Sequence, residues 1–69
     1  MTKIYACIMN GVKYIAISEE LGWNLYKIIN DTTMSTTPLH KLMCFNDCKI
    51  WESKEITRMG EDYLKLKTL

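Results

Sequence analysis

The stretch CIMNGVKYIAI, residues 7–17, decides the fold at the start of this chain. It consists of two apolar runs joined by Asn10 and Gly11. An Asn-Gly pair between such runs is the strongest short-range signal for a β-hairpin, because both residues accept the positive φ angles of a type I′ turn. The sequence therefore predicts antiparallel strands at about residues 3–9 and 12–18.

A two-residue turn also sets which residues face each other across the hairpin. The predicted pairs are Met9 with Val12, Cys7 with Tyr14, Ala6 with Ile15, Tyr5 with Ala16 and Ile4 with Ile17. One face then carries Tyr5, Cys7, Met9, Val12, Tyr14 and Ala16, and the other carries Ile4, Ala6, Ile8, Ile15 and Ile17. Only Lys13 interrupts the second face, so both faces of the ribbon are apolar and both need a cover.

The segment WNLYKIIN, residues 23–30, follows a turn-forming SEELG and is rich in aromatic and β-branched residues. These residue types favour a third strand of a meander. The alternative is a helix over residues 18–31 with Leu21, Leu25, Ile28 and Ile29 on one stripe, although Gly22 would cost it about 1 kcal/mol. We prefer the strand, and we interpret residues 31–37 as a polar connector.

The clearest helix signal lies in TPLHKLMCFND, residues 37–47. Thr37 is a possible cap, Pro38 suits the first helical position, and an apolar stripe follows, so we expect a short helix near residues 37–45. Residues 48–52 resemble a strand. The tail is ambiguous, because YLKLKTL alternates as a strand does whereas Ile56, Met59, Tyr63 and Leu66 keep helical spacing. Gly60 favours a hairpin turn there.

The expected fold class is therefore α+β. Residues 1–69 form a single small domain with an N-terminal antiparallel β-meander, one short α-helix and C-terminal strand-like segments. A chain of 69 residues removes only about 60% of its unfolded surface from water, so its core is thin. One short helix can cover one face of a sheet but hardly two, and an apolar patch left in water marks a partner surface. The alternative is that the C-terminal strands close over the second face as a small barrel or sandwich.

Charge and composition give little support to a polyanion partner. Nine basic and eight acidic residues nearly cancel and are interspersed, and Arg58 is the only arginine. Nucleic acid is therefore unsupported, though not excluded. The abundance of Lys, Ile, Asn and Tyr suggests an AT-rich genome, such as that of a bacteriophage or mobile element of a low-GC host. We find no secretory signal and no apolar run long enough to span a membrane, so we expect a cytoplasmic protein, in the host cytoplasm if it is viral.

The cysteines and the histidine are the candidates for metal or thiol chemistry. Cys7, His40, Cys44 and Cys48 could form a tetrahedral zinc site, since a helix would place His40 and Cys44 on one face. Tight CxxC-like pairs are missing, and free cysteines usually pack as small hydrophobes, so we expect no metal and no cofactor. Cys44 or Cys48 beside His40 could also act as a nucleophile, but no third group orients the pair. We expect no catalytic residues.

The function expected from the sequence is a non-enzymatic protein-binding module that binds and modulates or inhibits a host protein. The partner, a host protein or a second copy in a homodimer, would bury the predicted contact residues Tyr5, Tyr14, Trp23, Tyr26, Ile15 and Ile17. The alternative is a small nucleic-acid-binding regulator. It would use either an excisionase-like helix-turn-helix at residues 18–30 or a single-strand platform of aromatic residues interleaved with lysines.

Overall fold

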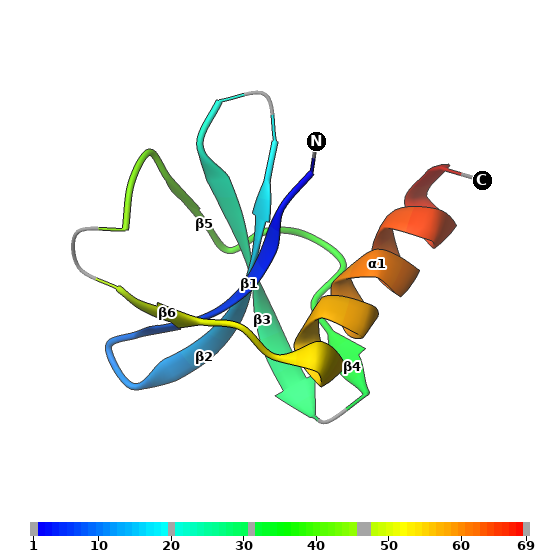
Figure 1. Ribbon diagram of the computed structural model, residues 1–69, viewed down its shortest axis with the longest axis horizontal. Coiled ribbons are helices and arrows are strands. Elements are labelled where there is room, and N and C mark those ends of the chain that lie inside the picture. The colour runs from blue at the N-terminus through cyan, green and yellow to red at the C-terminus, as the bar shows by residue number, and fades with distance from the viewer. Residues whose placement is uncertain (1, 20, 31, 46–47, 69) are drawn as a thin grey trace.

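A computed structural model describes residues 2–19, 21–30, 32–45 and 48–68. Within these residues the chain forms six strands and one helix, so the α+β class is confirmed (Figure 1). The elements are β1 (Ile4–Met9), β2 (Val12–Ser18), β3 (Trp23–Asn30), β4 (Thr33–Met34), β5 (His40–Leu42), β6 (Lys49–Trp51) and α1 (Lys54–Thr68).

The N-terminal hairpin is confirmed in both its turn and its register. Asn10 and Gly11 have φ angles of 54° and 78°, which is the left-handed region that a type I′ turn requires. All five predicted pairs are present, from Met9 opposite Val12 to Ile4 opposite Ile17. The hairpin is thus specified by local signals alone.

The remaining strands extend this hairpin on both sides in the order β4-β3-β2-β1-β6. The predicted third strand is β3, which lies antiparallel to β2, and the strand expected at residues 48–52 is β6, which pairs with β1. The free edge of β3 pairs with β4 near Ile28 and with β5 near Trp23. Two short segments therefore share one long strand.

The helix predicted near residues 37–45 is wrong. Its centre is β5, in which His40 pairs with Leu25 and Leu42 pairs with Trp23. The Leu39 N–H also donates to the Leu25 carbonyl oxygen at 2.8 Å. A helix of two turns is marginal in water, whereas the open edge of β3 offers partners for the backbone polar groups.

The C-terminal strand-like segments are also wrong after β6, because Lys54–Thr68 form α1. Ser53 caps this helix: its Oγ accepts the Ile56 N–H at 3.4 Å. Gly60 does not mark a turn. It lies in the middle of α1, where a Cβ would come within 2.8 Å of Ile4 Cγ2, so this glycine lets the helix approach the sheet.

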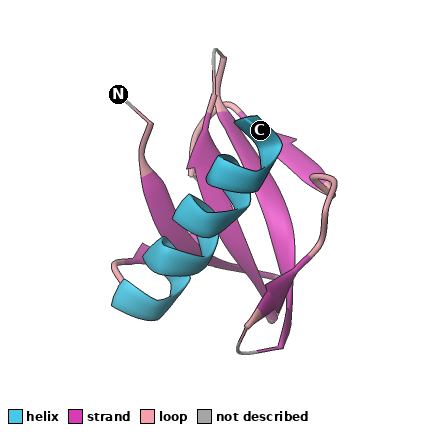
Figure 2. Ribbon diagram, turned by 90° about the vertical axis from the view of Figure 1, so that its right-hand side faces the viewer, coloured by secondary structure: helices cyan, strands magenta, loops and turns pink. Residues whose placement is uncertain are grey.

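Two apolar clusters form, one on each face of the sheet. Helix α1 lies across the first face, as Figure 2 shows, and its residues Ile56, Met59 and Tyr63 pack against a cluster of Ile15, Ile17, Tyr26 and Met34. On the opposite face, Cys7, Tyr14, Ala16 and Leu25 form a cluster. It is covered in part by Leu42 of β5 and by Phe45 and Cys48, which lie between β5 and β6 in the sequence.

The chain itself therefore covers both faces of the hairpin. On the face that carries Cys7 and Tyr14, the cover includes Leu42 of β5, which pairs with β3, and Phe45 and Cys48. Full burial of an Ile or Leu side chain contributes about 1.5–3 kcal/mol, so covering both faces is strongly favoured. In the described part of the chain, no helix has the length and apolar character needed to cross a membrane.

Candidate functional site

The six predicted contact residues divide into two groups in the structure. Ile15, Ile17 and Tyr26 are fully buried and Tyr14 is 6% exposed, so these four side chains belong to the core and are not available to a partner in this fold. Tyr5 and Trp23 are half-buried. Their ring centroids lie 5.5 Å apart. The structure therefore leaves two of the six at a surface.

Neither arrangement that would favour nucleic-acid binding, the helix-turn-helix at residues 18–30 or a single platform of aromatic residues, is present in the described part of the chain. Residues 23–30 are β3, so a recognition helix is missing there. Tyr14 and Tyr26 belong to the clusters on opposite faces of the sheet, so the aromatic residues do not share one platform.

The cysteines and His40 are placed by packing. Among the described residues, no three His, Cys, Asp or Glu side chains come close enough together to hold a metal ion. Cys7 is buried, Cys48 is half-buried and Cys44 is exposed, while His40 meets the Tyr14 ring edge-on at 5.4 Å. Burial, with a hydrogen bond between the Cys7 and Cys48 thiols, raises the pKa of Cys7 to about 12. A thiol with such a pKa is a poor nucleophile at neutral pH.

An aromatic surface lies where β1 and β3 begin. The Trp23 ring is close to the rings of Tyr5 and Phe45, with centroids 5.5 Å and 4.8 Å away. Two apolar residues of the adjoining segments are exposed to solvent: Leu21 is 68% exposed and Met43 is 69% exposed. We call these five residues the aromatic end.

Gly22 lies where the turn that carries Leu21 meets the segment that carries Met43. Its φ is 82°, and a Cβ there would lie 2.5 Å from the Leu42 carbonyl oxygen and 3.2 Å from Met43 Sδ. The turn before β3 therefore packs directly on the segment after β5. Leu21 precedes this glycine and Met43 follows Leu42, so both exposed residues belong to the two segments that meet at Gly22.

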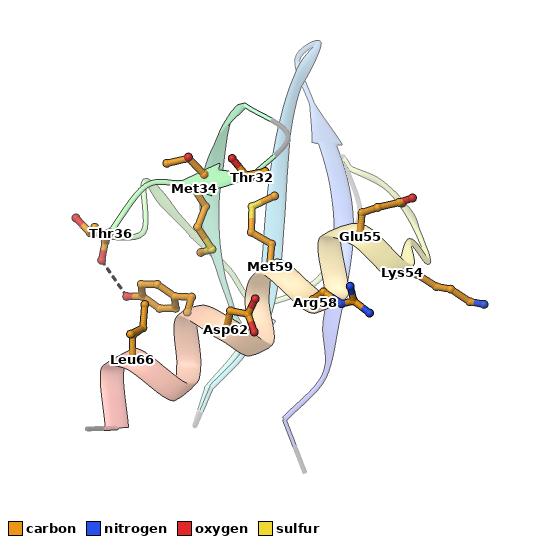
Figure 3. A pocket seen from close by; sticks show the side chains of 11 residues that line it. Thr32, Met34, Thr36, Lys54, Glu55, Arg58, Met59, Asp62 and Leu66 are labelled. Carbon is orange, nitrogen blue, oxygen red and sulfur yellow. Dashed lines mark hydrogen bonds between the residues drawn. The ribbon is translucent and has the colours of Figure 1, made fainter.

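A groove of about 630 Å³ lies on the other face of the sheet, between α1 and the β3–β4 hairpin (Figure 3). We call it the α1 groove. Its hairpin wall consists of Thr32, Thr33, Met34 and Thr36, and the apolar part of its helix wall consists of Met59, Tyr63 and Leu66. Such a volume is typical of ligand sites.

The two walls are joined by a hydrogen bond at one end. The Tyr63 hydroxyl donates to the Thr36 carbonyl oxygen at 2.9 Å (Figure 3). Met34 and Met59 extend into the space between the walls. Methionine side chains adapt to irregular apolar partners, so Met34 and Met59 let the α1 groove accommodate different apolar groups.

The charged residues of the helix wall alternate in sign along α1: Lys54, Glu55, Arg58 and Asp62. Lys54 extends away from the groove, whereas Asp62 lies on the helix wall between Met59 and Leu66 (Figure 3). The α1 groove therefore combines an apolar centre with charged groups on its helix wall, and Asp62 is the charged residue between the apolar residues Met59 and Leu66.

Several of these residues were missed by sequence reasoning. Phe45 comes close to Trp23, and Met43 to Gly22, only because β5 pairs with β3, and no local pattern predicts that pairing. The helical spacing of Met59, Tyr63 and Leu66 was a signal for one wall of the α1 groove, but the hairpin turn was preferred there. Comparisons with protein-family models, with curated proteins and with solved structures give no match.

Proposed function

We propose that this chain is a non-enzymatic protein-binding module and that the aromatic end is its contact surface. The observation that carries the proposal is that the rings of Trp23, Tyr5 and Phe45 lie at the end of the sheet where the chain also carries Leu21 and Met43, two apolar residues that are more than two thirds exposed. Exposed apolar groups gathered around Trp and Tyr are typical of the residues that dominate binding energy at protein interfaces.

The aromatic end suits a preformed contact. Trp23 already contacts two other rings, so its side chain loses little freedom when a partner covers it. Leu21 and Met43 would transfer from water to the interface on binding, which supplies the apolar driving force. Composition supports a bacterial or phage setting, and we propose that the partner is a host protein that this chain modulates or inhibits.

The test is affinity capture from an extract of a low-GC bacterium, using the full chain and a Leu21→Glu/Met43→Glu variant. We expect the wild type to retain a defined protein in about 0.5 M salt, where exposed charge pairs are largely screened. The variant should lose that protein. The matched control is Ile29→Glu, since Ile29 is 61% exposed but does not belong to the aromatic end.

Three results would contradict the proposal. The variant and the wild type could retain the same proteins equally well, or the control could lose them as the variant does. Retention of nucleic acid that is lost as salt rises would instead promote the alternative function. Circular dichroism of each variant ensures that a loss of binding is not a loss of folding.

A further inference from the structure

The edge of the sheet borders the α1 groove. Thr33 and Met34 are consecutive residues of β4, and consecutive side chains of a strand point to opposite faces. Both nevertheless line the groove. The groove is therefore bordered by the edge of β4 itself and not by one face of the sheet. In the described part of the chain, β4 has a strand neighbour, β3, on one side only.

The length of the groove suits a short extended peptide. β4 is two residues long, Thr33–Met34, and a five-residue extended peptide placed beside it would span roughly 16 Å. Met59 to Leu66 spans about 10 Å of helix, and the complete helix wall from Lys54 spans about 18 Å. An extended peptide lying along β4 would thus be in reach of α1 over its whole length.

From this arrangement we propose that the α1 groove binds an extended peptide that adds a strand to β4. The peptide would present apolar, basic and apolar side chains at alternate positions toward α1. Exposed strand edges recruit extended peptides in this way, with main-chain hydrogen bonds for affinity and side-chain pockets for specificity.

Spacing and charge determine this pattern. Alternate residues of a strand are roughly 6.6 Å apart, close to the 5.4 Å of one helical turn, so successive inward side chains meet successive turns of α1. Met59, Asp62 and Leu66 lie on those turns and all line the groove. A basic residue between two apolar ones would therefore place its charge on the Asp62 carboxylate and its neighbours on Met59 and Leu66.

This surface is separate from the aromatic end, since Met34 and Met59 belong to the cluster on one face of the sheet and Trp23 and Phe45 to the cluster on the other. The two proposals can therefore fail independently. Leu21→Glu/Met43→Glu should leave peptide binding at the α1 groove unchanged.

The probe is the synthetic peptide Ac-Leu-Thr-Lys-Thr-Leu-NH2, which presents the same side chains in either strand direction. It is titrated into the ¹⁵N-labelled full chain and followed by amide chemical shifts. We expect shifts at Thr32, Met34, Thr36 and Met59.

Two further peptides test the strand pairing. One carries N-methyl groups on its two threonine amides, and the other carries them on its lysine and last leucine amides. Only one of these two should lose binding, by at least about tenfold, because alternate amides face β4.

Asp62→Lys tests the charge. It should weaken the lysine peptide about two- to fivefold, as expected for an exposed ion pair, and strengthen the matching glutamate peptide by a similar factor. Glu61→Lys is the control, because Glu61 is the neighbouring acidic residue on α1 and does not line the α1 groove.

The proposal is overturned by any of four results: no shifts with the lysine peptide, equal binding of both N-methylated peptides, equal effects of Asp62→Lys and Glu61→Lys, or groove shifts that depend on protein concentration without peptide. Equal binding of the N-methylated peptides would indicate a site for small amphipathic molecules. Concentration-dependent shifts would indicate a second copy of the chain.

Discussion

Gly60 of α1 lies directly over Ile4 of β1, and a Cβ on Gly60 would come within 2.8 Å of Ile4 Cγ2 and 3.2 Å of Ile4 Cδ1. Ile4 is β-branched and its χ1 is stiff, so Cγ2 cannot easily move aside. The distance between the helix and the sheet therefore depends on the absence of a side chain at this position.

We predict that Gly60→Ala destabilises the fold by about 1 kcal/mol. The gain in helix propensity is about 1 kcal/mol, and overpacking a filled core costs about 1–3 kcal/mol. Urea unfolding followed by circular dichroism measures the difference. In an Ile4→Ala background the obstructing atoms are gone, so the same change should become stabilising. A stabilising effect of Gly60→Ala in the wild-type chain would show that the contact is not tight.

Gly22 and Gly11 form a matched pair for a second prediction. Both have positive φ angles, 82° and 78°, but a Cβ at Gly22 would meet the Leu42 carbonyl oxygen at 2.5 Å whereas a Cβ at Gly11 would meet nothing within 4 Å. Gly11→Ala should cost about 1 kcal/mol through backbone strain alone. Gly22→Ala should cost at least about 1 kcal/mol more, because a backbone atom must also shift.

The same pair tests the geometry of the aromatic end. Gly22→Ala should separate Leu21 from Met43 and weaken partner capture even where the protein remains folded, whereas Gly11→Ala should leave capture unchanged. Equal losses of stability and of capture in the two variants would contradict the packing described around Gly22. Thermal unfolding and capture at a temperature well below both midpoints provide the two measurements.

We predict that the buried Cys7 thiol lowers the free energy of unfolding in alkaline solution. Burial, helped by Cys48, raises the pKa of Cys7 from 9.0 to about 12. Below pH 9 the thiol is protonated in both the folded and the unfolded chain, so it contributes no pH dependence. Above pH 9 the unfolded chain releases this proton first, and the free energy of unfolding therefore falls until about pH 12.

Urea unfolding at pH 8 and pH 10.5 measures this loss, and a Cys7→Ala variant should show a smaller decline between the two pH values. Tyr26 adds to the decline at the upper end of this range, because burial, together with a hydrogen bond to Tyr63 and the charge of Glu19, raises the pKa of its hydroxyl. Tyr26→Phe separates that contribution. An identical decline in the wild type and in Cys7→Ala would show that the thiol is not protected.

The beginning of α1 depends on Ser53. Its Oγ accepts the Ile56 N–H, and its backbone carbonyl oxygen accepts the Thr57 N–H at 2.9 Å. Ser53→Ala removes only the side-chain cap and should cost about 1 kcal/mol, whereas Ser53→Asp keeps an acceptor and should cost much less. The free energy of unfolding of the two variants checks this order. Equal losses would indicate that the cap does not stabilise the helix.

Much of the sheet could be predicted because its signals are local. Asn10 and Gly11 accept positive φ angles, and the two-residue turn then determines every pair from Met9 to Ile17. The aromatic and β-branched content of residues 23–30 was sufficient for β3. Of the six predicted contact residues, Tyr5 and Trp23 are half-buried, whereas the other four are in the core.

By itself, the sequence determined the hairpin, its register and the third strand, since each depends on backbone preferences within a few residues. Only the tertiary structure decided that His40–Leu42 is a strand, that Gly60 is a contact point in a helix, and that both faces of the sheet are covered. These features depend on an open strand edge and on apolar area supplied by distant segments. Backbone hydrogen bonding and burial there outweigh a weak local preference for helix or turn.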